Sequence, residues 1–148
     1  MIECPSPNWD ERSLPISMLV LHYTGMADAA SAIARLADAQ ARVSAHYLVA
    51  EDGEVVRFGP EEKRAWHAGV SSWRGITDVN SASIGIEIVN PGHEFGYRPF
   101  PEAQIEALIP LVADIVDRHG IERRNVVGHS DVAPARKQDP GELFPWYR

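Results

Sequence analysis

Short hydrophobic segments alternate along this chain with longer amphipathic ones, and this alternation limits the folds open to it. The segments ISMLVLHYTG (16–25), SIGIEIVN (83–90) and NVVGH (125–129) are rich in branched aliphatic residues and predict buried strands. Residues 27–41 and 101–118 carry hydrophobic side chains at helical spacing and predict helices. Strands that alternate with helices are typical of one sheet covered by helices. The expected fold class is therefore α/β, or mixed α+β.

A hairpin and several irregular segments account for the rest of the chain. SAHYLVA (44–50) and EVVRF (54–58) are strand-like runs joined by Glu51-Asp52-Gly53, and Asp-Gly is a favoured tight turn. Pro110 interrupts the second helical pattern and predicts a kink there. Three stretches without periodicity predict an irregular N-terminal arm, a long surface loop and a proline-broken tail (1–15, 60–80 and 130–148).

Length and composition fit a soluble globular protein. The 148 residues predict one domain spanning 1–148, with 45% hydrophobic and 24% charged residues. A net charge of −7 disfavours general binding to nucleic acids, whose phosphates are repelled by an acidic surface. No apolar run approaches the about 20 residues that a membrane span needs. The single cysteine, Cys4, excludes an intramolecular disulfide. The sequence indicates no oligomeric state.

The N-terminal residues bear on location. The stretch MIECPSPNWDERSLP is polar and acidic, without the hydrophobic core of a secretion signal. We therefore expect a cytoplasmic protein, with a periplasmic location as the alternative if a signal was removed.

Two histidines follow predicted strands. His22 ends VLH and His129 ends VVGH, and the carboxyl ends of strands meet where open sheets bind ligands. Asp139 comes ten residues after His129, on a loop that Pro134 and Pro140 restrain. Two imidazoles and one carboxylate form a catalytic zinc set with a fourth position left for water. The alternative is that these are ordinary polar residues at strand ends, because local signatures such as H-E-x-x-H are absent.

A carboxylate and a lysine are the next candidates. Glu87 stands within GIEIV, where burial is costly without a partner. It is either a general base whose pKa is tuned by burial, or a residue on a solvated strand face. Lys137 lies two residues before Asp139 and is either a cation that stabilises a developing oxyanion or a solvated surface charge.

The other histidines are harder to assign. His46 starts a strand and is either a packed core residue or a group behind a ligand, with the core favoured. Trp66 and His67, within AWHAG, have the composition of a binding rim, an aromatic platform with a polar tip. His93 and His119 carry no pattern and are assigned no function.

Five segments together resemble one family. VLHYTG, VSAHYLVAEDGEVVRF, KRAWHAGVSSWRG, SIGIEIVN and GHSDVAPARKQDPG stand in the order seen in the zinc-dependent N-acetylmuramoyl-L-alanine amidases of the type-2 group. That group includes muropeptide-recycling amidases, phage T7-type lysozyme and animal peptidoglycan recognition proteins. The resemblance covers about residues 17–144 and implies a mixed sheet of five or six strands flanked by helices.

The resemblance also implies roles for particular residues. It makes His22, His129 and Asp139 ligands of Zn²⁺, Glu87 the catalytic carboxylate and Lys137 the partner of the oxyanion. Expected substrate-binding residues, by the same resemblance, are Trp66, His67, Tyr23 and Asn80.

Two departures separate this chain from the phage-type members. Those proteins resemble each other in having a tyrosine where this chain has Ala45, and a cysteine as third ligand where it has Asp139. Both differences make it more similar to the recycling and periplasmic enzymes, and they favour Glu87 as the catalytic group.

The implied reaction is hydrolysis of the amide between N-acetylmuramic acid, or its 1,6-anhydro form, and L-alanine of the stem peptide. The expected partner is a muropeptide or peptidoglycan fragment, and the implied role is cell-wall recycling. Two alternatives belong to other classes: a non-catalytic sensor of peptidoglycan fragments, and a zinc peptidase that cuts within the stem peptide.

Overall fold

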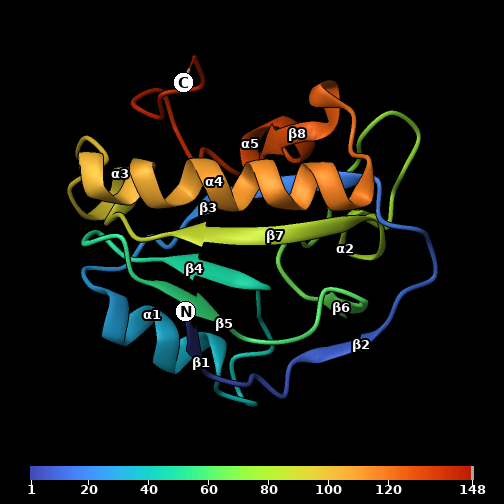
Figure 1. Ribbon diagram of the computed structural model, residues 1–148, viewed down its shortest axis with the longest axis horizontal. Helices are drawn as coiled ribbons and strands as arrows, with labels where there is room; N and C mark the ends of the chain where they lie inside the picture. Colours follow the sequence, from blue (N-terminus) through green and yellow to red (C-terminus); the bar gives the residue numbers. More distant parts are fainter. Residues whose placement is uncertain (148) are drawn as a thin grey trace.

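A six-stranded mixed sheet runs through the middle of the protein (Figure 1). The computed structural model describes residues 1–147. The strand order is β1-β5-β4-β7-β3-β8. The strands are Ile2–Glu3 (β1), Met18–Tyr23 (β3), Tyr47–Val49 (β4), Val55–Arg57 (β5), Ser83–Ile88 (β7) and Val126–Gly128 (β8). Trp9–Glu11 (β2) and Lys63–Ala65 (β6) form a separate antiparallel pair.

Helices lie on both sides of this sheet. The α-helices are Ala29–Leu36 (α1), Val79–Ala82 (α2), Gly92–Phe95 (α3), Glu102–His119 (α4) and His129–Val132 (α5), and Arg123–Asn125 (η1) is a 3₁₀ helix. Strands β4, β7, β3 and β8 are parallel to one another, whereas β4 and β5 form the antiparallel hairpin. The predicted fold class, a mixed sheet flanked by helices, is confirmed.

One sheet face, the helix face, packs against α4. Alternate side chains of β3 and β7 point to it because successive strand residues face opposite ways. They meet the buried side of α4 in one large apolar cluster, which includes Leu19, Leu21, Ile84, Ile86, Ile88, Ile105, Leu108 and Ile115. In Figure 1 the long helix α4 runs along one side of the sheet, and α1 lies on the other.

The opposite sheet face, the cavity face, is divided between two smaller apolar clusters. One packs Met18 and Val20 against α2 and the segment around Ala68. The other packs Leu48 and Val56 against α1. His22 and Glu87 project from the same face and belong to neither cluster. These two polar side chains therefore lie between the two apolar clusters of the cavity face.

Several segments expected to be irregular contain regular structure. The arm 1–15 contributes β1 and β2, since the backbone that pairs with β5 and β6 lies before or between the prolines rather than at them. The stretch 60–80 contains β6 and the start of α2. The tail 130–148 begins within α5, because Asp131 Oδ2 accepts a hydrogen bond from the Gly128 N–H at 2.8 Å and caps a short turn of helix. Periodicity cannot reveal such short elements.

Both long helical patterns form helices, with different bounds. The helix predicted at 27–41 spans Ala29–Leu36 only. Asp28 caps its start by accepting from Ser31 N–H at 2.7 Å, and Asp38 binds the Gln40 N–H at 3.0 Å in a turn that ends it. Helix α4 continues past Pro110, whose ring is exposed.

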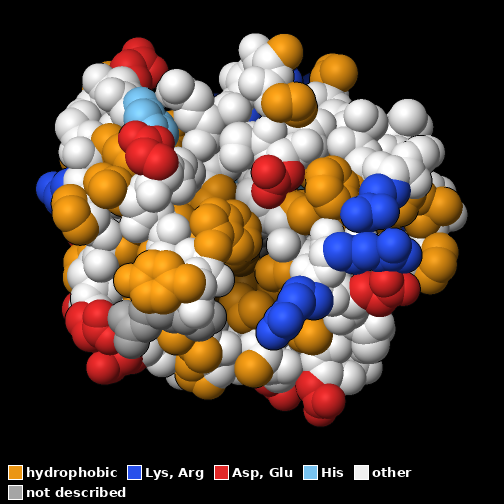
Figure 2. All heavy atoms as spheres, turned by 90° about the horizontal axis from the view of Figure 1, so that it is seen from above, with side chains coloured by type: hydrophobic (Ala, Val, Ile, Leu, Met, Phe, Trp, Pro, Cys, Tyr) orange, Lys and Arg blue, Asp and Glu red, His pale blue; other side chains and the backbone are white. Residues whose placement is uncertain are grey.

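The surface combines all side-chain types. On the face shown in Figure 2, hydrophobic side chains gather near the centre, basic ones form a short row at one side and acidic ones are scattered. Basic and acidic side chains are therefore distributed unevenly over this face. Within residues 1–147, none of the helices has the length and apolar character to traverse a bilayer.

Candidate metal centre

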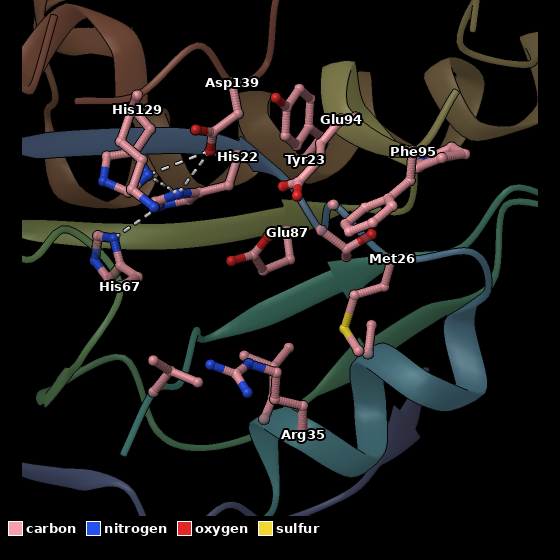
Figure 3. Close-up of a pocket in the computed structure, with 18 of the residues that line it drawn as sticks. His22, Tyr23, Met26, Arg35, His67, Glu87, Glu94, Phe95, His129 and Asp139 are labelled. Carbon is pink, nitrogen blue, oxygen red and sulfur yellow. Dashed lines mark hydrogen bonds and ion pairs between the residues drawn. The ribbon is translucent and has the colours of Figure 1, made fainter. Parts of the chain in front are cut away.

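Three side chains distant in sequence converge above the carboxyl end of β3. His22 comes from β3, His129 from the first residue of α5 and Asp139 from the loop after it. Nδ1 of His22 lies 2.9 Å from Nδ1 of His129, and Oδ2 of Asp139 is 3.3 Å from each of these nitrogens. All three residues are buried (Figure 3). We call this group the His-His-Asp cluster.

The cluster has the donor chemistry of a metal site. Nε2 of His129 lies 2.9 Å from the carbonyl oxygen of Ala68, which can only accept, so Nε2 donates and the neutral tautomer with this bond has its lone pair on Nδ1. Burial lowers the pKa of His22 to about 4, which keeps that ring neutral. Electron-rich atoms therefore face one another across about 3 Å, an arrangement that a shared cation stabilises. The cluster can hold a metal ion.

Glu87 lies beside this cluster. It is the register partner of His22 in the parallel pair β3–β7, so both side chains leave the same sheet face. Its Oε2 atom is buried and has no hydrogen-bond partner among residues 1–147. Burial raises the pKa of Glu87 well above its ordinary value, the Asp139 charge raises it further and Lys137 lowers it. A buried carboxylate with an unused oxygen can accept a proton from a bound molecule.

A cavity of about 920 Å³ opens in front of these groups. Tyr23, Trp66 and Lys137 line it together with the cluster and Glu87. Tyr23 is held by its hydroxyl, which lies 3.0 Å from Nδ1 of His93. The cavity is large enough for a ligand of several linked units.

His67 belongs to the lining of the cavity, whereas Asn80 does not. The His67 ring is 9% exposed and sits behind His22, with its Nδ1 2.9 Å from Nε2 of His22. The Asn80 side chain is absent from the cavity lining, and its Oδ1 accepts hydrogen bonds from the backbone N–H groups of His67 and Ala68. His46 is buried among backbone groups, as the core interpretation expected.

The cavity also has walls that the sequence did not indicate. Arg35 extends toward it from α1, opposite Glu87, while Met26, Glu94 and Phe95 form another side (Figure 3). Arg35 stands next to Leu36 and three residues after Ala32, the two buried residues of α1. A helical wheel of this segment could have located Arg35 at the border of the buried face. The sequence offers no comparable signal for Glu94 and Phe95 as lining residues.

Comparisons with known proteins identify relatives of this chain. Residues 12–142 match the family described as N-acetylmuramoyl-L-alanine amidase. The chain is 48% identical to the N-acetylmuramoyl-L-alanine amidase AmiD of Escherichia coli K12 over 143 residues, which cover 88% of this chain and 51% of AmiD. This chain thus spans about half the length of that relative.

Solved structures share the fold over almost the whole chain. One is E. coli AmiD in complex with the substrate anhydro-N-acetylmuramic acid-L-Ala-D-γ-Glu-L-Lys, with a TM-score of 0.81 and 45% identity, covering 93% of this chain and 58% of the other. Another is an AmpD derivative, with a TM-score of 0.87 and 34% identity, covering 99% and 90%.

Proposed function

The chain belongs to the N-acetylmuramoyl-L-alanine amidase family, and we propose that it hydrolyses the amide between the muramic acid and L-alanine of peptidoglycan fragments. The observation that carries this proposal is the His-His-Asp cluster at the base of a cavity, beside an unpartnered carboxylate. The substrate bound in the AmiD structure supports a 1,6-anhydro-muropeptide as the molecule cut, and cell-wall recycling as the role.

Zinc is the metal that we propose for the cluster. Two imidazoles and one carboxylate are a donor set of catalytic zinc sites. When bound, zinc acidifies a water molecule and polarises the substrate carbonyl. The protein supplies a neutral His22, and a His129 ring oriented by the Ala68 carbonyl.

Glu87 is the general base in this proposal. Its carboxylate takes a proton from the attacking water and returns it to the amine nitrogen of L-alanine as the C–N bond breaks. Lys137, which lines the cavity two residues before Asp139, stabilises the negative charge that develops on the carbonyl oxygen. Trp66 and Tyr23 offer apolar surface and a hydroxyl to the rest of the substrate.

Product analysis tests the reaction. The zinc-loaded protein is incubated with anhydro-N-acetylmuramic acid carrying a tripeptide, and the products are identified by mass spectrometry. We expect the free anhydro sugar and an intact tripeptide. A shortened peptide would instead identify a peptidase, and an unchanged fragment that remains bound would identify a sensor; either result contradicts the proposal.

A substitution tests the base. Glu87→Gln keeps the shape of the side chain but removes the proton acceptor, so turnover should fall by about 10²–10⁴-fold while zinc content stays unchanged. Glu62→Gln, at an exposed position, is the control and should turn over substrate as the parent does. Parent-like turnover in Glu87→Gln would remove Glu87 from the mechanism.

The cytoplasmic location expected from the sequence stays a prediction. Fractionation of cells that produce the chain from its natural gene would test it.

A further inference from the structure

His67 lines the cavity and also contacts a candidate metal ligand, His22. We propose that His67 is a positioning residue, which accepts a hydrogen bond from Nε2 of His22 and thereby keeps Nδ1 of His22 unprotonated and directed at the cation. The inference rests on the zinc site proposed above. The hydrogen bonds around His67 determine which ring nitrogens carry a proton. They form a chain from Ser83 through His67 to His22, and each bond in it is one link.

The first link is the hydroxyl of Ser83. This oxygen lies 2.6 Å from the carbonyl oxygen of Val79, a group that can only accept. The single hydroxyl proton therefore points at Val79. The same oxygen lies 3.1 Å from Nε2 of His67, and it can only accept there. Nε2 of His67 consequently carries a proton.

The second link is the pair of imidazoles. The His67 ring is buried, which favours its neutral form with one ring proton. With that proton on Nε2, Nδ1 of His67 is an acceptor, and it lies 2.9 Å from Nε2 of His22. Nε2 of His22 must then donate. The lone pair of His22 is left on Nδ1, the atom that faces His129 and Asp139 (Figure 3).

The surrounding chain is built to hold the His67 ring. A Cβ atom on Gly85 would come within 2.6 Å of the ring, so only glycine leaves it room at this point of β7. Asn80 Oδ1 accepts from the N–H groups of His67 at 3.0 Å and Ala68 at 2.8 Å. Because Ala68 also supplies the carbonyl that orients His129, one side chain of α2 fixes the outer partners of both histidines.

His67 lines the cavity, but its hydrogen bonds leave no ring nitrogen free to bind a substrate. Both ring nitrogens already face protein groups, and the side chain has little exposed surface. His67 therefore acts through His22, as outer partners of metal-bound histidines do when they fix the tautomer and the ring orientation.

Nuclear magnetic resonance of the zinc-loaded protein tests the proton positions directly. Long-range ¹H–¹⁵N correlations of ¹⁵N-labelled imidazoles report which nitrogen carries the proton. We expect Nε2–H on both His67 and His22. A proton on Nδ1 of His67 would reverse the bond to His22 and overturn the inference, without reference to any variant.

Variants test the consequence for the metal. His67→Phe keeps a buried ring but removes the acceptor, so zinc affinity should fall by about 10–100-fold in a chelator competition. His67→Asn, whose oxygen stands near the former Nδ1 position, should recover part of that loss. The matched control is His46→Phe, since His46 is also buried but its ring nitrogens face the Lys63 carbonyl, Arg12 and the Gly85 N–H rather than a candidate ligand.

We expect His46→Phe to lower the unfolding temperature and leave zinc affinity unchanged. The inference fails if His67→Phe binds zinc as the parent does, or if both phenylalanine variants lose affinity equally. These readouts do not depend on amide hydrolysis. If zinc affinity and the imidazole resonances are as expected but no hydrolysis is seen, only the proposed function is contradicted.

Discussion

Asp139 is the residue on which the candidate centre most depends, because it alone brings negative charge between two neutral rings. Its Oδ2 is 3.3 Å from both Nδ1 atoms, and the side chain is buried. A neutral set of two imidazoles would hold a divalent cation weakly in this surrounding, since nothing would offset the loss of the ion's hydration.

Asp139→Ala should therefore reduce zinc affinity by more than about 100-fold, beyond the loss typical of an outer hydrogen bond. Chelator competition followed by elemental analysis measures it. Asp117→Ala, which changes an exposed carboxylate on α4, should have no effect. Full zinc occupancy in Asp139→Ala at limiting zinc would contradict the assignment of this ligand.

The residues of the His-His-Asp cluster could be predicted from the sequence, whereas the place of His67 behind His22 could not. His22 and His129 follow aliphatic runs, and strand ends meet at one sheet edge, so their proximity follows from the pattern. The place of His67 depends on the missing side chain of Gly85, eighteen residues later on a strand. Such a contact leaves no periodic signal, and the composition of AWHAG favoured an exposed rim instead.

At the scale of elements, the two sheet faces have separate tasks. Helix α4 covers the helix face, while α1 and the loops border the cavity on the other. The amphipathic pattern of 101–118 predicted α4 because its 18 residues repeat the helical period several times. The short elements α2, α3 and α5 have four residues each, too few for a period to be seen.

The separation of faces predicts a stability effect without a change in the site. Ile115→Ala empties a fully buried position of α4 and should lower the free energy of unfolding by about 2–5 kcal/mol. Ile109→Ala, on the exposed side of the same helix, should change it by no more than about 0.5 kcal/mol. Urea unfolding measures both. Comparable losses in the two variants would show that α4 is packed differently.

At the scale of the whole molecule, Glu61 joins segments that the chain places far apart. Its carboxylate accepts two hydrogen bonds from Arg118, at 2.7 and 2.8 Å, and one from Tyr47 at 2.5 Å, and it lies 2.7 Å from Nε2 of His119. Burial raises the pKa of Glu61, but the hydrogen bonds outweigh it and lower the pKa from 4.5 to about 2.

This network predicts a pH dependence of stability. Because the folded state lowers the pKa of Glu61, its contribution is complete above about pH 4.5 and is lost as the pH falls toward 2. Glu61→Gln should lower stability at pH 7 by on the order of 2 kcal/mol, given that Arg118 is partly solvated. The difference from the parent should shrink by pH 3.

Urea unfolding with a chelator present measures this difference without a contribution from metal release. Glu62→Gln, one residue along and exposed, should follow the parent at both pH values. A constant difference between parent and Glu61→Gln across the range would mean that folding does not lower the pKa of Glu61.

The unbroken pairing of β3 with β7 limits how the gene can change. Six consecutive partners, from Met18 with Ser83 to Tyr23 with Ile88, join the strand of His22 to that of Glu87. One inserted or deleted codon within either strand would turn the following side chains over, which would bury Glu87 beneath α4 or drive isoleucines into the cavity. Natural length variation should therefore accumulate in the loops, while these twelve positions admit replacements but no gaps.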